Sequence, residues 1–75
     1  MYTPTEIDQA KLDRAFTYHA PVGDQPERYV QIRAKAKELA ELLVTLCPSS
    51  RELSLGITKL EECVFWSNAS IARNE

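Results

Sequence analysis

Two long runs of apolar residues, each spaced by three and four positions, most constrain what this chain can fold into. The apolar positions of the first run are Tyr29, Ile32, Ala36, Leu39, Leu43 and Leu46. The second run is Leu53, Ile57, Leu60, Val64, Ser67 and Ile71, in which Ser67 is the one polar residue. A repeat of about 3.5 residues is typical of a helix that packs along another helix. Pro48 ends the first run, and the join is short, so we expect the two helices to fold back as an antiparallel hairpin.

Capping signals indicate where three helices begin. Each combines a threonine, serine or aspartate with a glutamate three positions later, and two of them add a proline inside the first turn. The signals are Thr3-Pro4-Thr5-Glu6, Asp24-Gln25-Pro26-Glu27 and Ser49-Ser50-Arg51-Glu52. We therefore predict an all-α chain. Its parts are a short N-terminal helix within residues 1–16, a connector at 17–25 and hairpin helices at 26–47 and 50–73.

The length of the chain and its surplus apolar surface predict self-association. Seventy-five residues allow one small domain, 1–75, and a chain of this size buries only about 60–65% of its unfolded surface. The last helix carries a second apolar row beside its seam, made of Leu55, Phe65, Ala69 and Ala72, and Trp66 widens this apolar surface. Within that helix, Gly56 is expected to permit a close backbone approach. Because two helices share only one seam, we expect a homo-oligomer, with a monomeric three-helix bundle as the alternative.

Composition excludes several classes of protein. A hydrophobic content of 44% and a charged content of 27% argue against disorder. The net charge of −2 argues against a generally basic protein that binds DNA or RNA. Two cysteines are too few for a secreted disulfide framework, and one histidine cannot complete a zinc site with them. Without a long apolar stretch, we expect a soluble intracellular protein with no metal, cofactor or membrane partner.

A basic stretch without any acid occupies the start of the first long helix, and its members are Arg28, Arg33, Lys35 and Lys37. On a helix, Arg28 and Lys35 share one face while Arg33 and Lys37 share another, with the apolar seam between the two pairs. Cations that flank a helix–helix seam can converge on an anion held at an interface. The alternative is a solvated stretch that pairs with the glutamates following it.

The connector adds two further binding candidates and no catalytic one. Tyr18 offers a flat ring that can stack on a base, and His19 offers a hydrogen-bond donor to phosphate. Alternatively, Tyr18 caps the open end of the hairpin and His19 is exposed. His19 is the only imidazole in the chain, and the adjacent Glu61 and Glu62 diverge on a helix. We therefore predict no catalytic residue.

Two segments of the chain resemble a known family. They are Phe16-Thr17-Tyr18-His19-Ala20-Pro21, with the basic stretch that follows, and Trp66-Ser67-Asn68-Ala69-Ser70-Ile71-Ala72-Arg73, with the hairpin residues before it. Together they resemble the phage anti-CBASS cyclic-oligonucleotide sponge family, whose helical hairpin is shared with a phage anti-Thoeris sponge. The resemblance extends from Phe16 to Glu75.

The resemblance implies a non-enzymatic protein that forms a compact helical homo-hexamer. Its members sequester the cyclic di- and trinucleotides of bacterial CBASS immunity in the cytoplasm of the infected host. Their cyclic-dinucleotide pockets lie between protomers and use an N-terminal tyrosine and a basic helix residue, which correspond here to Tyr18 and Arg33. The predicted ligand-binding residues are Tyr18, His19, Arg28, Arg33 and Lys37. The alternative is a structural or protein-interaction module without a nucleotide ligand.

Overall fold

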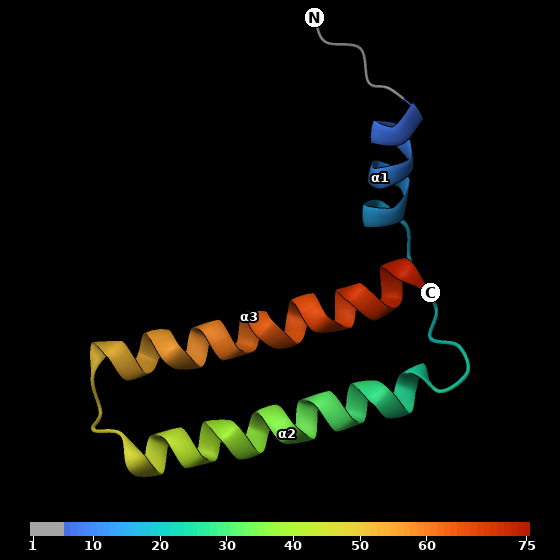
Figure 1. The fold of residues 1–75 in the computed structure, drawn as a ribbon. Coiled ribbons are helices and arrows are strands. Elements are labelled where there is room, and N and C mark those ends of the chain that lie inside the picture. Colours follow the sequence, from blue (N-terminus) through green and yellow to red (C-terminus); the bar gives the residue numbers. More distant parts are fainter. Residues whose placement is uncertain (1–5) are drawn as a thin grey trace, which may run out of the picture.

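The computed structural model describes residues 6–75, which contain three α-helices and no strand. Helix α1 spans Glu6–Phe16, α2 spans Gln25–Leu46 and α3 spans Arg51–Asn74. Helices α2 and α3 run antiparallel and side by side, whereas α1 projects away from them near the C-terminal end of α3 (Figure 1). The predictions of an all-α chain and a helical hairpin are confirmed over these residues, whereas the first capping signal falls largely outside them.

The turn of the hairpin lies at Pro48 and Ser50, as the sequence predicts. Helix α2 ends at Leu46, and Cys47 adopts an extended conformation (φ −108°, ψ 139°), which is the conformation favoured before a proline. Helix α3 begins with Ser50 as its N-cap, because the Ser50 hydroxyl accepts a hydrogen bond of 3.1 Å from the Leu53 N–H. The capping box that begins at Ser49 therefore predicts the right turn but is one residue early.

Helix α2 also begins where the sequence predicts, although its N-cap residue makes no capping hydrogen bond. Asp24 occupies the N-cap position and a proline follows inside the first turn, but the Asp24 side chain makes no capping hydrogen bond. Its carboxylate lies 3.3 Å from the Arg28 guanidinium instead. Gly23, just before the cap, has a positive φ of 57°, a backbone conformation that glycine adopts at little cost.

The seam between α2 and α3 differs from the predicted one on the α2 side only. All six predicted positions of α3 are half-buried. On α2, however, Leu39 and Leu46 are exposed by 44% and 70%, and Ala40 and Cys47 are half-buried in their place. The cause is the period of a straight helix, which is 3.6 residues and therefore drifts away from a strict 3.5-residue repeat.

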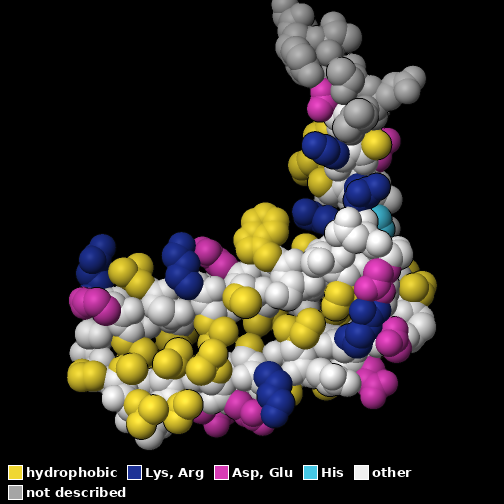
Figure 2. All heavy atoms as spheres, viewed as in Figure 1, with side chains coloured by type: hydrophobic (Ala, Val, Ile, Leu, Met, Phe, Trp, Pro, Cys, Tyr) yellow, Lys and Arg dark blue, Asp and Glu magenta, His cyan; other side chains and the backbone are white. Residues whose placement is uncertain are grey.

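The hairpin has no closed core of its own. Among residues 8–75 no hydrophobic side chain is buried, and Gln25 is the single buried residue. Phe65 and Trp66 are 74% and 67% exposed, and hydrophobic side chains lie open along both hairpin helices (Figure 2). The radius of gyration is 16.9 Å, whereas a compact chain of this length has about 11 Å. Helix α1 thus leaves the surplus apolar face uncovered, as the oligomer prediction requires.

Gly56 does not serve the close approach that the sequence suggests, at least within one chain. A Cβ atom added at Gly56 would meet no other atom within 4 Å. The reason for a glycine in the second turn of α3 therefore does not lie in the packing of α2 against α3.

Candidate functional site

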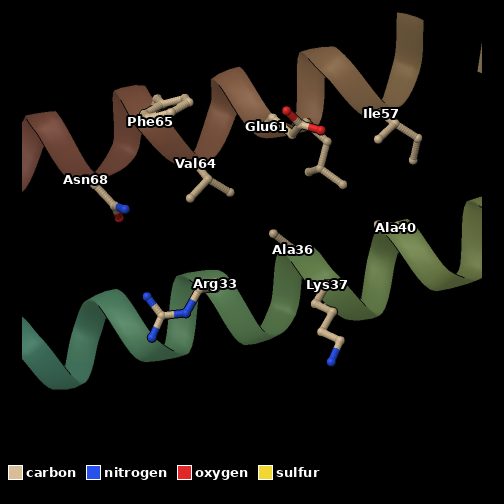
Figure 3. A pocket seen from close by; sticks show the side chains of 10 residues that line it. Arg33, Ala36, Lys37, Ala40, Ile57, Glu61, Val64, Phe65 and Asn68 are labelled. Atoms are coloured by element: carbon tan, nitrogen blue, oxygen red, sulfur yellow. The ribbon is translucent and has the colours of Figure 1, made fainter. Parts of the chain in front are cut away.

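A groove of about 540 Å³ lies between α2 and α3, near the middle of the hairpin (Figure 3). Its lining residues from α2 are Arg33, Ala36, Lys37 and Ala40. Those from α3 are Ile57, Leu60, Glu61, Val64, Phe65 and Asn68. The floor is apolar because small or aliphatic side chains of the seam form it, and polar groups stand at its edges. Such a mixture suits a ligand that carries both flat apolar parts and charge.

Arg33 and Lys37 are the two cations of this groove, one helical turn apart on α2. Both are exposed, and neither forms an ion pair or hydrogen bond with the described residues. Arg33 extends along α2 on the side of Asn68, and the end of Lys37 points away from α3 (Figure 3). The spacing of the sequence places these two cations on one face, and the structure has them beside one groove. Their charges are available to an anion.

Asn68 is a polar group of this groove that the sequence analysis missed. It points from α3 toward α2 (Figure 3), and its Oδ1 atom is buried without a hydrogen-bond partner. Together with Arg33, it also lines a second groove of about 310 Å³ formed with Tyr29, Ala69 and Ala72. A buried amide oxygen is normally paired, so this one is an acceptor that a single chain leaves unsatisfied. The available signal was a polar residue flanking an otherwise apolar seam.

Arg28 lies outside the central groove and forms ion pairs with the carboxylates of Asp24 and Glu75. Its guanidinium donates to both carboxylate oxygens of Glu75 and lies 3.3 Å from the Asp24 carboxylate. The hydrogen bond from Arg28 holds the pKa of Glu75 below its usual value, and the same bond raises the pKa of Arg28. Lys35 is paired as well, with Glu38 at 3.3 Å. The basic stretch therefore divides into two paired cations and two unpaired ones.

Tyr18 and His19 do not line the groove of their own chain. Tyr18 is 85% exposed in the connector, so it does not cap the open end of the hairpin. His19 is exposed too, and its Nε2 atom donates a hydrogen bond of 2.8 Å to the carbonyl oxygen of Arg14. That bond satisfies one of the unpaired carbonyls at the end of α1. Of the five predicted site residues, the structure brings together only Arg33 and Lys37.

The described side chains form no cluster that could bind a metal ion, and the two adjacent glutamates of α3 diverge. Glu61 lines the central groove, whereas the adjacent Glu62 points elsewhere and pairs with Lys59 at 3.4 Å. The two carboxylates thus diverge, as predicted for neighbours on a helix. Residues 6–75 contain no group of three or more His, Cys, Asp or Glu side chains that could hold a metal ion. Nor is any helix in this part of the chain long and apolar enough to cross a membrane.

The fold and the groove define a helical-hairpin domain with an uncovered apolar face and two uncommitted cations. The family model described as Acb2/Tad1, hairpin domain, matches residues 8–72. The chain therefore belongs to this family, the anti-CBASS and anti-Thoeris sponge family, and the resemblance seen in the sequence is confirmed. This is a family of sponge-type anti-defence domains and not a known enzyme family. Searches of curated proteins and of solved structures return no match.

Proposed function

We propose that this protein is a phage anti-defence sponge in which residues 1–75 form a single domain. It binds cyclic di- and trinucleotide messengers of bacterial CBASS immunity in the cytoplasm of the infected host and does not cleave them. The observation that carries this proposal is the pair of unpaired cations, Arg33 and Lys37, beside an apolar groove in a chain of a sponge family.

The chemistry of a cyclic dinucleotide matches that groove. Its ring carries two phosphate charges and two flat bases, so a complementary site needs cationic donors and apolar or aromatic surface. The planar guanidinium of Arg33 can donate two parallel hydrogen bonds to one phosphate, and Lys37 adds a point charge. The aliphatic floor of the groove offers apolar contact to a base.

In this proposal, Tyr18 and His19 of a neighbouring protomer contribute to the binding site. Neither lines the groove of its own chain, and the 85% exposure of Tyr18 leaves its ring free to stack. The family's cyclic-dinucleotide pockets lie between protomers, so a second chain that brings its connector to the groove would complete the site. His19 already donates from Nε2 to the Arg14 carbonyl, so it donates to a phosphate only when Nδ1 carries a proton as well.

A homo-hexamer is the assembly that we propose for this purpose. The absence of buried hydrophobic residues in residues 8–75 leaves a lone hairpin without a core, and Phe65 and Trp66 present large exposed rings. Burial of such rings contributes about 1.5–3 kcal/mol each, which favours association. Self-association therefore supplies both the missing core and the second wall of the pocket.

Sequestration differs from catalysis in what it demands of the site. A sponge lowers the concentration of free messenger by tight, slow-release binding, and it needs no general acid, base or nucleophile. The divergence of Glu61 and Glu62 is compatible with this requirement, because no acid/base pair is needed in the groove.

The test is a panel of cyclic di- and trinucleotides, each incubated with the protein and then recovered after heat denaturation. We expect at least one nucleotide to be depleted from solution and returned intact on heating. Recovery of a converted product would indicate an enzyme. If no nucleotide is retained at micromolar protein concentration, the chain is a protein-interaction module, which its exposed Phe65 and Trp66 would also suit.

A further inference from the structure

The connector between α1 and α2 is attached to the far end of the chain. Residues 17–24 have no regular secondary structure and carry Tyr18 and His19, yet they lead directly into the buried side chain of Gln25. In Figure 1 this connector curves past the C-terminal end of α3 before α2 begins. The open end of the hairpin is thus where the connector, α2 and α3 meet.

Gln25 links the connector to α3 through three hydrogen bonds. Its backbone N–H donates to the Val22 carbonyl at 3.0 Å, and its Oε1 accepts from the Val22 N–H at 3.1 Å. Its Nε2 donates across the hairpin to Glu75 Oε1 at 3.4 Å. Gln25 is only 4% exposed, so its own polar atoms are shielded from water, whereas Glu75 stays partly exposed. A single glutamine therefore fixes the last turn of the connector and ties it to α3.

Arg28 completes the same cluster one turn into α2. Its guanidinium donates hydrogen bonds from two nitrogen atoms to the two oxygens of the Glu75 carboxylate, which is the bidentate geometry of an arginine–carboxylate pair. It also reaches Asp24 at 3.3 Å, at the end of the connector. The side chains of Arg28 and Glu75 are 34% and 42% exposed, so solvent only partly screens the pair.

A phosphate ligand would have to displace these carboxylates before it could reach Arg28. The positive charge of Arg28 is already matched by Glu75 and Asp24, so the cluster offers an incoming anion no net attraction. Arg33, on the next turn, has no such partner. The contrast separates a cation that holds the protein together from one that is available to a ligand.

We infer that Gln25, Arg28 and Glu75 form a clamp that fixes the connector at the open end of the hairpin. Arg28 is then a positioning residue for Tyr18 and His19, and not a phosphate ligand. The role of the clamp in ligand binding depends on the proposed function, whereas its role in ordering the connector does not.

The variant Glu75→Ala distinguishes the two roles of Arg28 because they predict opposite signs. If Arg28 is a positioning residue, removal of Glu75 loosens the connector and weakens binding of a cyclic dinucleotide roughly tenfold, as Arg28→Ala does. If Arg28 is a phosphate ligand, removal of Glu75 frees its charge and tightens binding. In the clamp, Arg28→Ala combined with Glu75→Ala costs less affinity than the sum of the two single changes, because both remove the Arg28–Glu75 contact.

Hydrogen exchange of the free protein provides a readout that needs no nucleotide. In Glu75→Ala, the hydrogen-bonded amides of Val22 and Gln25 should exchange about tenfold faster than in the wild type, with oligomer mass unchanged. Glu38→Ala is the matched control, because it removes an exposed ion pair with Lys35 elsewhere on α2. Wild-type exchange in Glu75→Ala, or tighter nucleotide binding, would overturn the clamp. Failure of the wild-type chain to bind any nucleotide would overturn the proposed function, and the exchange result would still decide whether the clamp exists.

Discussion

Arg28 and Arg33 lie five positions apart on the same helix and have opposite surroundings. Arg28 faces the carboxylates of Glu75 and Asp24, whereas Arg33 faces alanine, valine and Asn68 at the edge of an apolar groove. Both residues belong to one basic stretch in the sequence, and the difference arises from what the opposite helix places beside each. The number of cations on a helix thus does not define an anion-binding site. What matters is which of these cations lack a carboxylate partner in the folded chain.

The same contrast holds for the two regions as wholes. The open end of the hairpin is closed by polar contacts around Gln25, the single buried residue of the described chain. The middle of the hairpin has apolar residues that remain half-exposed, and Phe65 stands at its edge. One region is complete within a single chain, and the other has surface that a second chain and a ligand can cover.

The largest effect is expected from a substitution in the middle of the hairpin, where apolar surface remains exposed. We expect Phe65→Glu to dissociate the oligomer to monomers, because burial of an unpaired charge in a dry contact costs several kcal/mol. Thr58→Glu introduces the same charge at an exposed position of α3 that lines neither of the two grooves and should leave the mass unchanged. Light scattering at micromolar concentration measures both. A monomeric wild type, or an intact Phe65→Glu oligomer, would contradict the assembly.

A smaller effect is expected from acidification, which protonates Glu75 in the polar cluster at the open end of the hairpin. Arg28 holds the pKa of Glu75 below its usual value, so the ionised carboxylate stabilises the folded state. This contribution is present above the usual pKa of a glutamate and is lost as the pH falls through the lowered one. We therefore expect the melting temperature of the wild type to fall more than that of Glu75→Gln between about pH 7 and pH 3. Parallel melting curves for the two proteins would show that the pair contributes nothing to stability.

The smallest expected effect tests whether a second chain reaches Gly56. Nothing in the hairpin meets a Cβ atom at this position, and alanine favours a helix interior over glycine by about 0.5–1 kcal/mol. Gly56→Ala should therefore stabilise the protein by about that amount in denaturant unfolding at fixed protein concentration. Destabilisation would instead place a neighbouring subunit against Gly56.

The sequence predicted the parts of the fold that depend on local signals. The apolar rows, Pro48 and Ser50 define the hairpin and its turn, because periodicity and capping act over a few residues. The exchange of Leu39 and Leu46 for Ala40 and Cys47 in the seam was not predicted. It depends on the small difference between a repeat of 3.5 and one of 3.6 residues, which accumulates along a helix.

Of the candidate site, the shared groove of Arg33 and Lys37 follows from their spacing. The pairing of Arg28 does not, because its partner Glu75 lies 47 positions away in the sequence. The sequence places Asn68 beside the seam but does not show that its oxygen is buried without a partner, which depends on how the chain packs. Contacts between distant residues decide which polar groups stay available, and a single sequence does not contain those distances.

The central claim is that Arg33 holds a phosphate of a cyclic dinucleotide and Tyr18 stacks on a base. Calorimetric titration of one tightly bound cyclic dinucleotide into the wild type, Arg33→Ala, Tyr18→Ala and the control Lys59→Ala tests it most directly. We expect the first two variants to lose about 1–3 kcal/mol of binding free energy, a tenfold to hundredfold rise in Kd, with oligomer mass unchanged. Lys59, paired with Glu62 away from the central groove, should cost much less. Wild-type affinity in both Arg33→Ala and Tyr18→Ala would contradict the account.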